Sequence, residues 1–179
     1  LMRVHGRKLN AWIYEQLARR VPELDKVFFD KLKRWFDYPE ENRLEKKLLR
    51  AAHYLATQWE FGIIYHFNQA IYGIDATKAA IESNIEDHYD LAGVQKISLK
   101  GKTSKFIDLV GQLRFQKRWA QSPRVPETSV MGHVLIVAIL GYFCAAELGA
   151  CDERIVNDFL CGLFHDLPEV LTRDIISPV

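Results

Sequence analysis

Apolar residues recur every three or four positions along most of the chain, which is the spacing of one face of an α-helix. Short clusters of proline, glycine and polar residues interrupt this pattern, as at residues 38–42. In the first half of the chain the spacing predicts helices over residues 8–20, 22–37, 43–71 and 75–87. We therefore expect this half to be mainly helical.

The pattern changes at residues 94–105, where apolar and polar residues alternate in part around Gly101. Such alternation is compatible with a short β-hairpin or with an irregular connection. Helical spacing then resumes and predicts helices over residues 106–119, 127–149, 152–164 and 168–171. The sequence thus predicts an all-α protein with room for one short β-hairpin. Residues 1–105 form a mainly helical N-terminal region without a chemical motif, and residues 106–179 carry the candidate chemistry.

The longest uninterrupted apolar run, residues 134–146, lies between His133 and Glu147. It is shorter than the roughly 20 residues that a membrane-spanning helix needs, so it predicts a buried core helix. No secretory pattern opens the sequence, because the basic residues near its start are followed by amphipathic sequence. We therefore expect a cytoplasmic protein that does not span a membrane.

The composition is that of a globular protein. Of 179 residues, 49% are hydrophobic and 26% are charged, and the formal net charge is +1. Proteins that bind nucleic-acid polymers usually carry a marked basic excess, so this balance argues against such a partner and leaves small anionic ligands open. The cysteines Cys144, Cys151 and Cys161 are odd in number and lack CxxC spacing, which predicts reduced core thiols in a cytoplasmic protein.

His165 and Asp166 stand where a predicted helix ends before Pro168. Imidazole nitrogens and carboxylate oxygens together suit Zn, Mn, Fe, Co or Ni. His133 lies on the preceding apolar segment, so two packed helices would bring all three groups to one divalent transition metal ion. Taken alone, His133 would more often be a hydrogen-bonded core residue, and the His-Asp pair would be a cation and a capping carboxylate at a helix end. Their occurrence as an ordered set favours the metal site.

Further polar groups accompany this predicted metal site. Glu169 follows the His-Asp pair by three residues, so on one helical turn its carboxylate would face the same cavity and act as a base on water. Arg118 and Trp119 combine a permanent cation with a large aromatic face, which suits a phosphate and a sugar or base. Asp174 and Ser177 follow in a polar segment that would contact the rest of a substrate. The default interpretation of Arg118 and Trp119 is a surface cation beside a core anchor.

Together these residues resemble the HD-domain metal-dependent phosphohydrolases, and among them the branch that includes bacterial 5′-deoxynucleotidases. The resemblance covers residues 113–179 and rests on the Arg-Trp pair, on His133, and on a His-Asp-x-x-Glu-Val-Leu-Thr-x-Asp motif that begins at His165. It implies an HD-domain-like helical bundle in which His133, His165 and Asp166 bind one divalent metal ion, Mn, Co, Ni, Fe or Zn.

The same resemblance implies an activity and roles for the neighbouring residues. Arg118 would orient the substrate phosphate, Trp119 would pack on the nucleoside, and Glu169 would help to activate water. Asp174 and Ser177 would lie near the sugar, where a tight pocket selects deoxyribose, and His133 would also border the substrate. The implied reaction removes phosphate from a small nucleotide, with a deoxyribonucleoside 5′-monophosphate as the leading candidate, and a homodimer is compatible with the family.

Two departures from the family pattern leave alternatives open. The family has a further aspartate ligand on a later helix, so residues 106–179 would be the N-terminal part of the domain, truncated before its last metal ligand. Arg173 stands where the family commonly has glycine, which adds a cation near the predicted cavity. One alternative is hydrolysis of a nucleoside triphosphate or signalling nucleotide, which would require Arg173, Arg124 and Lys117 to converge on the metal. The other is a degenerate HD module that binds a nucleotide or a protein without catalysis.

Overall fold

The computed structural model describes residues 2–22, 26–38, 40–120, 122–123 and 125–172, and most of these residues are α-helical. The chain divides into two compact units, Leu1–Gln95 and Lys96–Val179, and each is described by itself. Within the described ranges no β-strand forms, although an isolated antiparallel bridge pairs Lys117 with Ser129. The all-α fold class predicted from the apolar spacing is confirmed.

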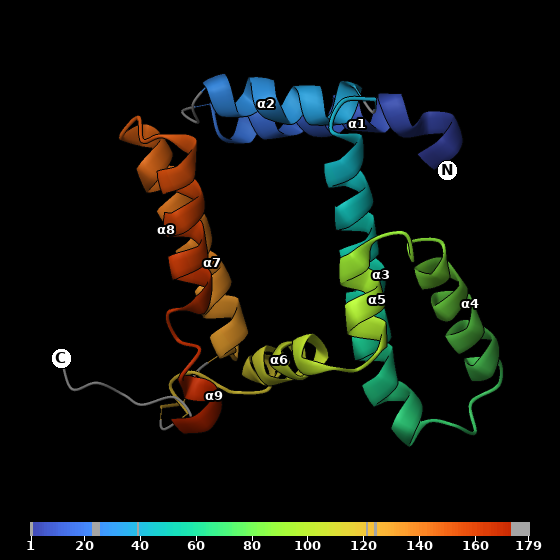
Figure 1. Ribbon diagram of the computed structural model, residues 1–179. Helices are drawn as coiled ribbons and strands as arrows, with labels where there is room; N and C mark the ends of the chain where they lie inside the picture. Colours follow the sequence, from blue (N-terminus) through green and yellow to red (C-terminus); the bar gives the residue numbers. More distant parts are fainter. Residues whose placement is uncertain (1, 23–25, 39, 121, 124, 173–179) are drawn as a thin grey trace. The chain divides into compact units, whose positions relative to one another are not determined.

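The first unit contains two pairs of packed helices and the start of a shorter one. Helix α1 (Met2–Arg20) packs on α2 (Lys26–Asp37), and α3 (Arg43–Phe67) packs on α4 (Ile74–Glu86), as Figure 1 shows. The division between the units falls within α5 (Ala92–Ser98). The buried residues Ala51, Ile85 and Val94 form a core, and Tyr54, Leu55, Ile81 and Leu91 pack against it.

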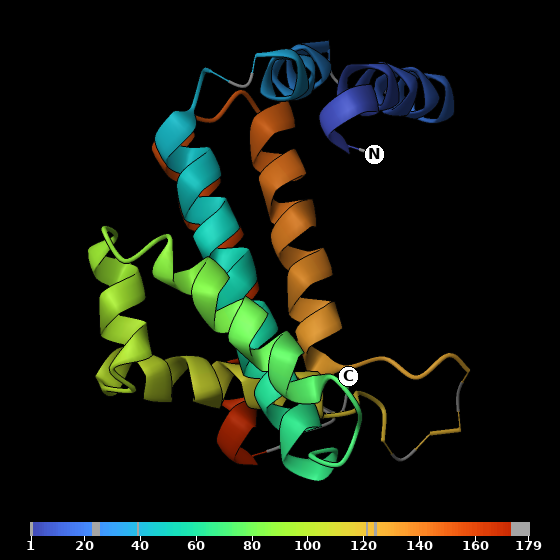
Figure 2. The ribbon, with the colours of Figure 1, turned by 90° about the vertical axis from the view of Figure 1, so that its right-hand side faces the viewer.

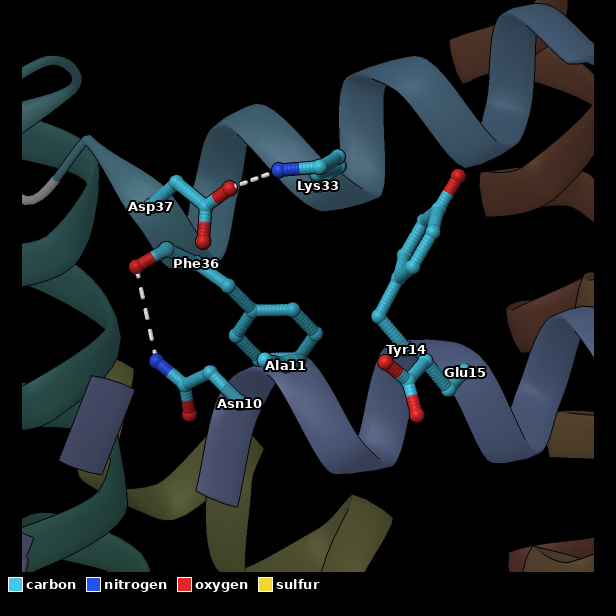
Figure 3. Close-up of a pocket in the computed structure, with 7 residues that line it drawn as sticks. All are labelled: Asn10, Ala11, Tyr14, Glu15, Lys33, Phe36 and Asp37. Atoms are coloured by element: carbon cyan, nitrogen blue, oxygen red, sulfur yellow. Dashed lines mark hydrogen bonds and ion pairs between the residues drawn. The ribbon is translucent and has the colours of Figure 1, made fainter. Parts of the chain in front are cut away.

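A groove between α1 and α2 is lined by aromatic, amide and charged side chains (Figure 3). The Asn10 side-chain amide donates to the carbonyl of Phe36 at 3.4 Å, and Lys33 forms an ion pair with Asp37. The ion pair lies within α2, and the hydrogen bond between Asn10 and Phe36 joins the two helices at one end of the groove. None of the residues with predicted chemistry lines it.

Residues 94–105 do not form the β-hairpin that their partial alternation allowed. They complete α5, turn at residues 99–101 and begin α6 (Lys102–Gly111). Packing explains the difference, because Val94 is 3% exposed in the core with α3 and α4. Ile97, one helical turn later, is partly buried. A short helix with one buried side produces an alternation that resembles that of a strand over so few residues.

The second unit is built on α7 (Val130–Glu147) and α8 (Asp152–Phe164), which run side by side in opposite directions (Figures 1 and 2). Gly149, with φ of 68°, provides the left-handed residue that ends α7 and reverses the chain. A Cβ atom on Gly162 of α8 would lie 2.7 Å from Ala138 Cα of α7, so glycine is needed for this close approach. The antiparallel packing brings the first turn of α7 beside the last turn of α8.

A small apolar cluster lies at that end of the helix pair. Leu113 of the 3-10 helix η1 (Gln112–Arg114) is buried together with Val130 and Val134 of α7. Met131, Leu163 of α8 and Val170 of α9 (Glu169–Thr172) pack against these residues. The cluster therefore fixes η1, the start of α7, the end of α8 and α9 relative to one another, and the residues of the predicted site stand on these elements.

Helix α7 is less buried than its apolar sequence led us to expect. It buries the stripe Val130, Val134, Ala138 and Ala145, and it exposes Leu135, Ile136, Ile139 and Leu140. Within the described ranges it is the helix that is long and apolar enough to cross a membrane, a test that core helices of soluble proteins also pass. Since 22% of its 18 residues are buried, the expectation of a buried core helix is wrong.

The expectation of core cysteines is also wrong. Cys144, Cys151 and Cys161 are free thiols, and all three are exposed. The physical reason is the narrow contact between α7 and α8, which buries one stripe of α7 and fully buries no residue of α8. Cys144 lies outside the α7 stripe, Cys161 is exposed on α8, and Cys151 precedes the first turn of α8.

Candidate metal centre

The start of α7 positions His133. Ser129 is the N-cap, and its side-chain oxygen accepts a hydrogen bond from the Gly132 backbone N–H at 3.0 Å. The His133 backbone N–H donates to the carbonyl of Ser129 at 3.1 Å, which places this histidine in the first helical turn. The next residue, Val134, is 1% exposed and anchors the turn in the apolar cluster. The His133 ring is thereby held at one end of the helix pair.

The end of α8 positions His165 and Asp166. His165 Nδ1 lies 2.8 Å from the carbonyl oxygen of Gly162. A carbonyl only accepts hydrogen bonds, so Nδ1 is the donor in this contact, and in the neutral ring Nε2 has a lone pair for a metal ion. That Nε2 atom lies 3.2 Å from Asp166 Oδ1. The hydrogen bond to the helix end therefore selects the tautomer that a metal ligand needs.

His133, His165 and Asp166 converge on one place in the second unit. Asp166 Oδ2 lies 3.6 Å from His133 Nε2, and the two imidazole ring centroids are 5.5 Å apart. One donor atom of each residue lies within 4.8 Å of the others, and no other such group occurs among the described residues. Ligands of one tetrahedral ion with bonds of about 2.0–2.2 Å stand roughly 3.3–3.6 Å apart, so shifts of about 1 Å would complete the contact. The set fits a divalent ion.

Arg118 contacts the same carboxylate. Its backbone N–H donates to the Thr128 carbonyl at 2.9 Å, beside the bridge between Lys117 and Ser129, and this pairing holds it against the entry to α7. Its guanidinium Nη1 donates to Asp166 Oδ2 at 3.2 Å, and the two side chains are 21% and 18% exposed. Asp166 is thus shared between the two histidines and a permanent cation. The sequence predicted Arg118 near this site as a ligand of the substrate phosphate. It did not predict the contact with Asp166.

Trp119 follows with an unusual backbone conformation. Its φ of 56° lies in the left-handed region, which costs a residue with a Cβ atom about 1–2 kcal/mol. The Ser122 N–H donates to the Trp119 carbonyl at 2.9 Å, which closes a turn at this point. The indole is 51% exposed. A strained turn that carries a half-exposed aromatic ring next to Arg118 is typical of a binding loop, where strain is tolerated for position.

Glu169 lies one turn beyond Asp166. Its backbone N–H donates to the Asp166 carbonyl at 3.0 Å, and it is the first residue of α9. Its Oε2 atom is buried. Val170 holds the short helix in the apolar cluster, so Glu169 and Asp166 are parts of one rigid corner.

The remaining candidates divide into two groups. Asp174 and Ser177, expected near the sugar, lie outside the described residues, as do Arg124 and Arg173. Lys117 is described, and its ammonium forms an ion pair with Glu127 at 2.6 Å. This pair draws the charge of Lys117 toward the loop that precedes α7.

Gly162 is the functional position that the sequence did not suggest. It allows α7 and α8 to approach closely, and its carbonyl orients His165. One signal was available in the sequence, because Gly162 stands inside a helical pattern three residues before His165. Glycine lowers helix propensity, so its presence there indicates a packing requirement.

The arrangement offers two neutral imidazole nitrogens, one carboxylate and one guanidinium in a small volume. The nitrogen and carboxylate donors suit a divalent ion that polarises an oxygen, and the guanidinium suits an oxyanion such as phosphate. Glu169, which the sequence suggested as a base, lies one helical turn after Asp166.

The comparisons with known proteins agree with this geometry. Residues 110–179 match a family model described as an HD domain, whereas no curated protein and no solved structure matches the chain significantly. HD domains bind divalent metal ions and are in general metal-dependent phosphohydrolases. The match and the His-Asp cluster together support the assignment of residues 110–179 to the HD-domain superfamily.

Proposed function

We propose that the second unit removes phosphate from a small nucleotide, with a deoxyribonucleoside 5′-monophosphate as the leading substrate. The observation that carries the proposal is the convergence of His133, His165 and Asp166 with the guanidinium of Arg118. Metal ligands alone would fit many hydrolytic or structural sites. A guanidinium beside them adds recognition of an oxyanion, and phosphate has the geometry that this group binds best.

Each residue has a role that follows from its position. His133, His165 and Asp166 would hold a divalent transition metal ion, which when bound supplies Lewis-acid activation of water and of a phosphoryl oxygen. Arg118 would donate hydrogen bonds to the phosphate oxygens and offset the negative charge that develops on them. Glu169, fixed one turn away, would accept the proton of the attacking water.

Trp119 would provide the contact with the nucleoside. Its ring is half-exposed and adjacent in sequence to the guanidinium that would bind the phosphate, so one turn would grip both ends of a nucleotide. An aromatic ring stacks on any base, which supports a broad preference among bases. The preference for deoxyribose is the most specific part of the proposal, and it rests on the family resemblance of the motif that contains Asp174.

The monophosphate is favoured over a triphosphate by the cations near the site. Larger polyphosphates need additional cationic groups around the phosphates. Of the three cations that would supply them, Lys117 is described, and it is paired with Glu127. Its charge is therefore already offset, which supports the smaller substrate.

A metal and substrate screen tests the proposal. The protein would be supplied with Mn, Co or Ni and offered deoxyribonucleoside monophosphates, ribonucleoside monophosphates and nucleoside triphosphates, with released phosphate as the measurement. Asp166→Ala is expected to abolish turnover. Asp158→Ala is the matched control, because that carboxylate pairs with Arg154 on the same helix, away from the metal ligands. No turnover with any metal, or equal turnover in Asp166→Ala and wild type, would refute the proposal.

A further inference from the structure

Asp166 has three close polar neighbours, and two of them lie on the same carboxylate oxygen. Its Oδ2 atom accepts a hydrogen bond from Arg118 Nη1 at 3.2 Å and lies 3.6 Å from His133 Nε2. Its Oδ1 atom lies 3.2 Å from His165 Nε2. Oδ2 is the oxygen that faces both Arg118 and His133. A metal ion bound to His133 would therefore compete with the guanidinium for this oxygen.

We propose that Arg118 exchanges partners between Asp166 and the substrate phosphate, and thereby couples phosphate binding to metal binding. This inference rests on the proposed function and adds a regulatory step to the same site. With no phosphate present, Arg118 remains on Asp166 and reduces its affinity for the metal ion. When phosphate binds, the guanidinium transfers to it, and Asp166 Oδ2 no longer shares its lone pairs between Arg118 and the metal ion.

The physical basis is the competition of two cations for one carboxylate. A guanidinium and a divalent ion on the same carboxyl group repel each other, and the side chains are only 21% and 18% exposed, so water screens this repulsion incompletely. Phosphate offers Arg118 a bidentate acceptor of equal or greater charge, whereas the contact with Asp166 is a single hydrogen bond. Since binding coupling is reciprocal, metal must also strengthen phosphate binding by the same factor.

The backbone around Arg118 supports a moving side chain on a fixed main chain. Its N–H is held by the Thr128 carbonyl at 2.9 Å, and the adjacent bridge between Lys117 and Ser129 fixes the same segment. The long side chain can therefore change acceptor while its Cα stays in place. A second Arg-Asp pair in the unit, Arg154 with Asp158, lies along α8 without a metal ligand and offers a matched comparison.

The first arm of the test measures metal affinity. Calorimetric titration with Mn²⁺ would compare wild type, Arg118→Ala and the control Arg154→Ala, each with and without inorganic phosphate. Without phosphate, Arg118→Ala is expected to bind Mn²⁺ about fivefold more tightly than wild type, as loss of a partly buried competitor implies. Phosphate is expected to tighten Mn²⁺ binding more in wild type than in Arg118→Ala. Unchanged or weaker Mn²⁺ binding by Arg118→Ala would overturn the exchange and make Arg118 a support for Asp166.

The second arm needs no metal and so separates this inference from the proposed function. Phosphorus NMR would follow the binding of inorganic phosphate in metal-free buffer. Asp166→Asn releases Arg118 and is expected to tighten phosphate binding about fivefold, and this gain should vanish when Arg118→Ala is also present. If Asp166→Asn tightened phosphate binding equally with and without Arg118→Ala, the loss of one negative charge would explain the effect, and the exchange would be overturned. If this arm succeeds while no metal supports turnover, the hydrolase proposal fails and the partner exchange stands.

Discussion

A single methyl group at residue 162 should disturb both the packing of the second unit and its metal site. Gly162 lies where α8 crosses α7, and a Cβ atom there would stand 2.7 Å from Ala138 Cα and 2.9 Å from Ala138 N. The same glycine supplies the carbonyl that accepts the hydrogen bond of His165 Nδ1 at 2.8 Å. Gly162→Ala therefore tests in one variant whether the helix contact holds the metal ligands.

The magnitude follows from two opposed effects. Carbon atoms in contact prefer about 3.5–4.0 Å, so α7 and α8 would have to separate by roughly 1 Å. The atoms that block the methyl group belong to the backbone of Ala138 and cannot rotate away, which places the cost at about 2–3 kcal/mol, in the upper part of the range for overpacked cores. Alanine restores about 1 kcal/mol of helix propensity. We expect a net destabilisation of about 1–2 kcal/mol.

Gly62 provides the matched control. It lies within α3, and a Cβ atom there would meet nothing within 4 Å. Gly62→Ala should therefore gain about 1 kcal/mol from propensity alone. The difference between the two substitutions isolates the steric contact from the change in helix propensity.

Amide hydrogen exchange resolves the two effects, because it reports the opening free energy of each segment separately. Protection of α7 and α8 should fall in Gly162→Ala, and protection of α3 should rise in Gly62→Ala. Metal affinity should also fall about tenfold in Gly162→Ala, as is usual when the group that orients a ligating histidine moves. If Gly162→Ala instead raises the protection of α8 and leaves metal affinity unchanged, the close helix contact and its link to the site are wrong.

Three further predictions concern the cap, the strained turn and one surface ion pair. Ser129→Ala should destabilise the second unit by about 1 kcal/mol through loss of the α7 N-cap, measured by exchange protection of α7. Trp119→Gly should be about 1 kcal/mol more stable than Trp119→Ala in chemical unfolding, because glycine adopts a positive φ freely, while both variants raise KM for the nucleotide. The hydrogen bond from Lys47 holds the pKa of Asp90 below its ordinary value, so this contact stabilises the fold above the unfolded pKa and is lost as pH falls through the folded pKa. An NMR titration should find the Asp90 pKa raised toward its ordinary value in Lys47→Ala, and an unchanged pKa would contradict the contact.

Helical spacing was sufficient to predict the fold class and most helices, because the spacing of apolar residues within one short segment determines an amphipathic face. It failed at residues 94–105, where α5 is too short for its period to be distinguished from that of a strand. It also misjudged α7, since an apolar sequence records the tendency to be buried and not the area that a partner covers. The exposed residues Leu135, Ile136 and Leu140 show the difference.

The ligand set was predictable for a different reason. His165 and Asp166 are adjacent, and an antiparallel helix pair brings the start of one helix to the end of the next, so His133 had a natural place beside them. The contact between Arg118 and Asp166 was not predictable in this way. It joins residues 48 positions apart through a loop, and no period of the sequence encodes where a long side chain finds its acceptor.

The charges of the site give an independent reason to expect a phosphate monoester. The ion pair between Arg118 and Asp166 is neutral overall, and a metal ion binds histidine in its neutral form, so His133 and His165 would add no charge as ligands. A divalent ion then adds two positive charges, and a phosphate monoester carries about 1.5–2 negative charges near pH 7, so ion and substrate compensate each other. A triphosphate brings about twice that charge and would need a further cation. Lys117, which precedes Arg118 in sequence, already forms an ion pair with Glu127. A triphosphate would therefore leave more negative charge uncompensated than a monoester, which supports the proposed substrate.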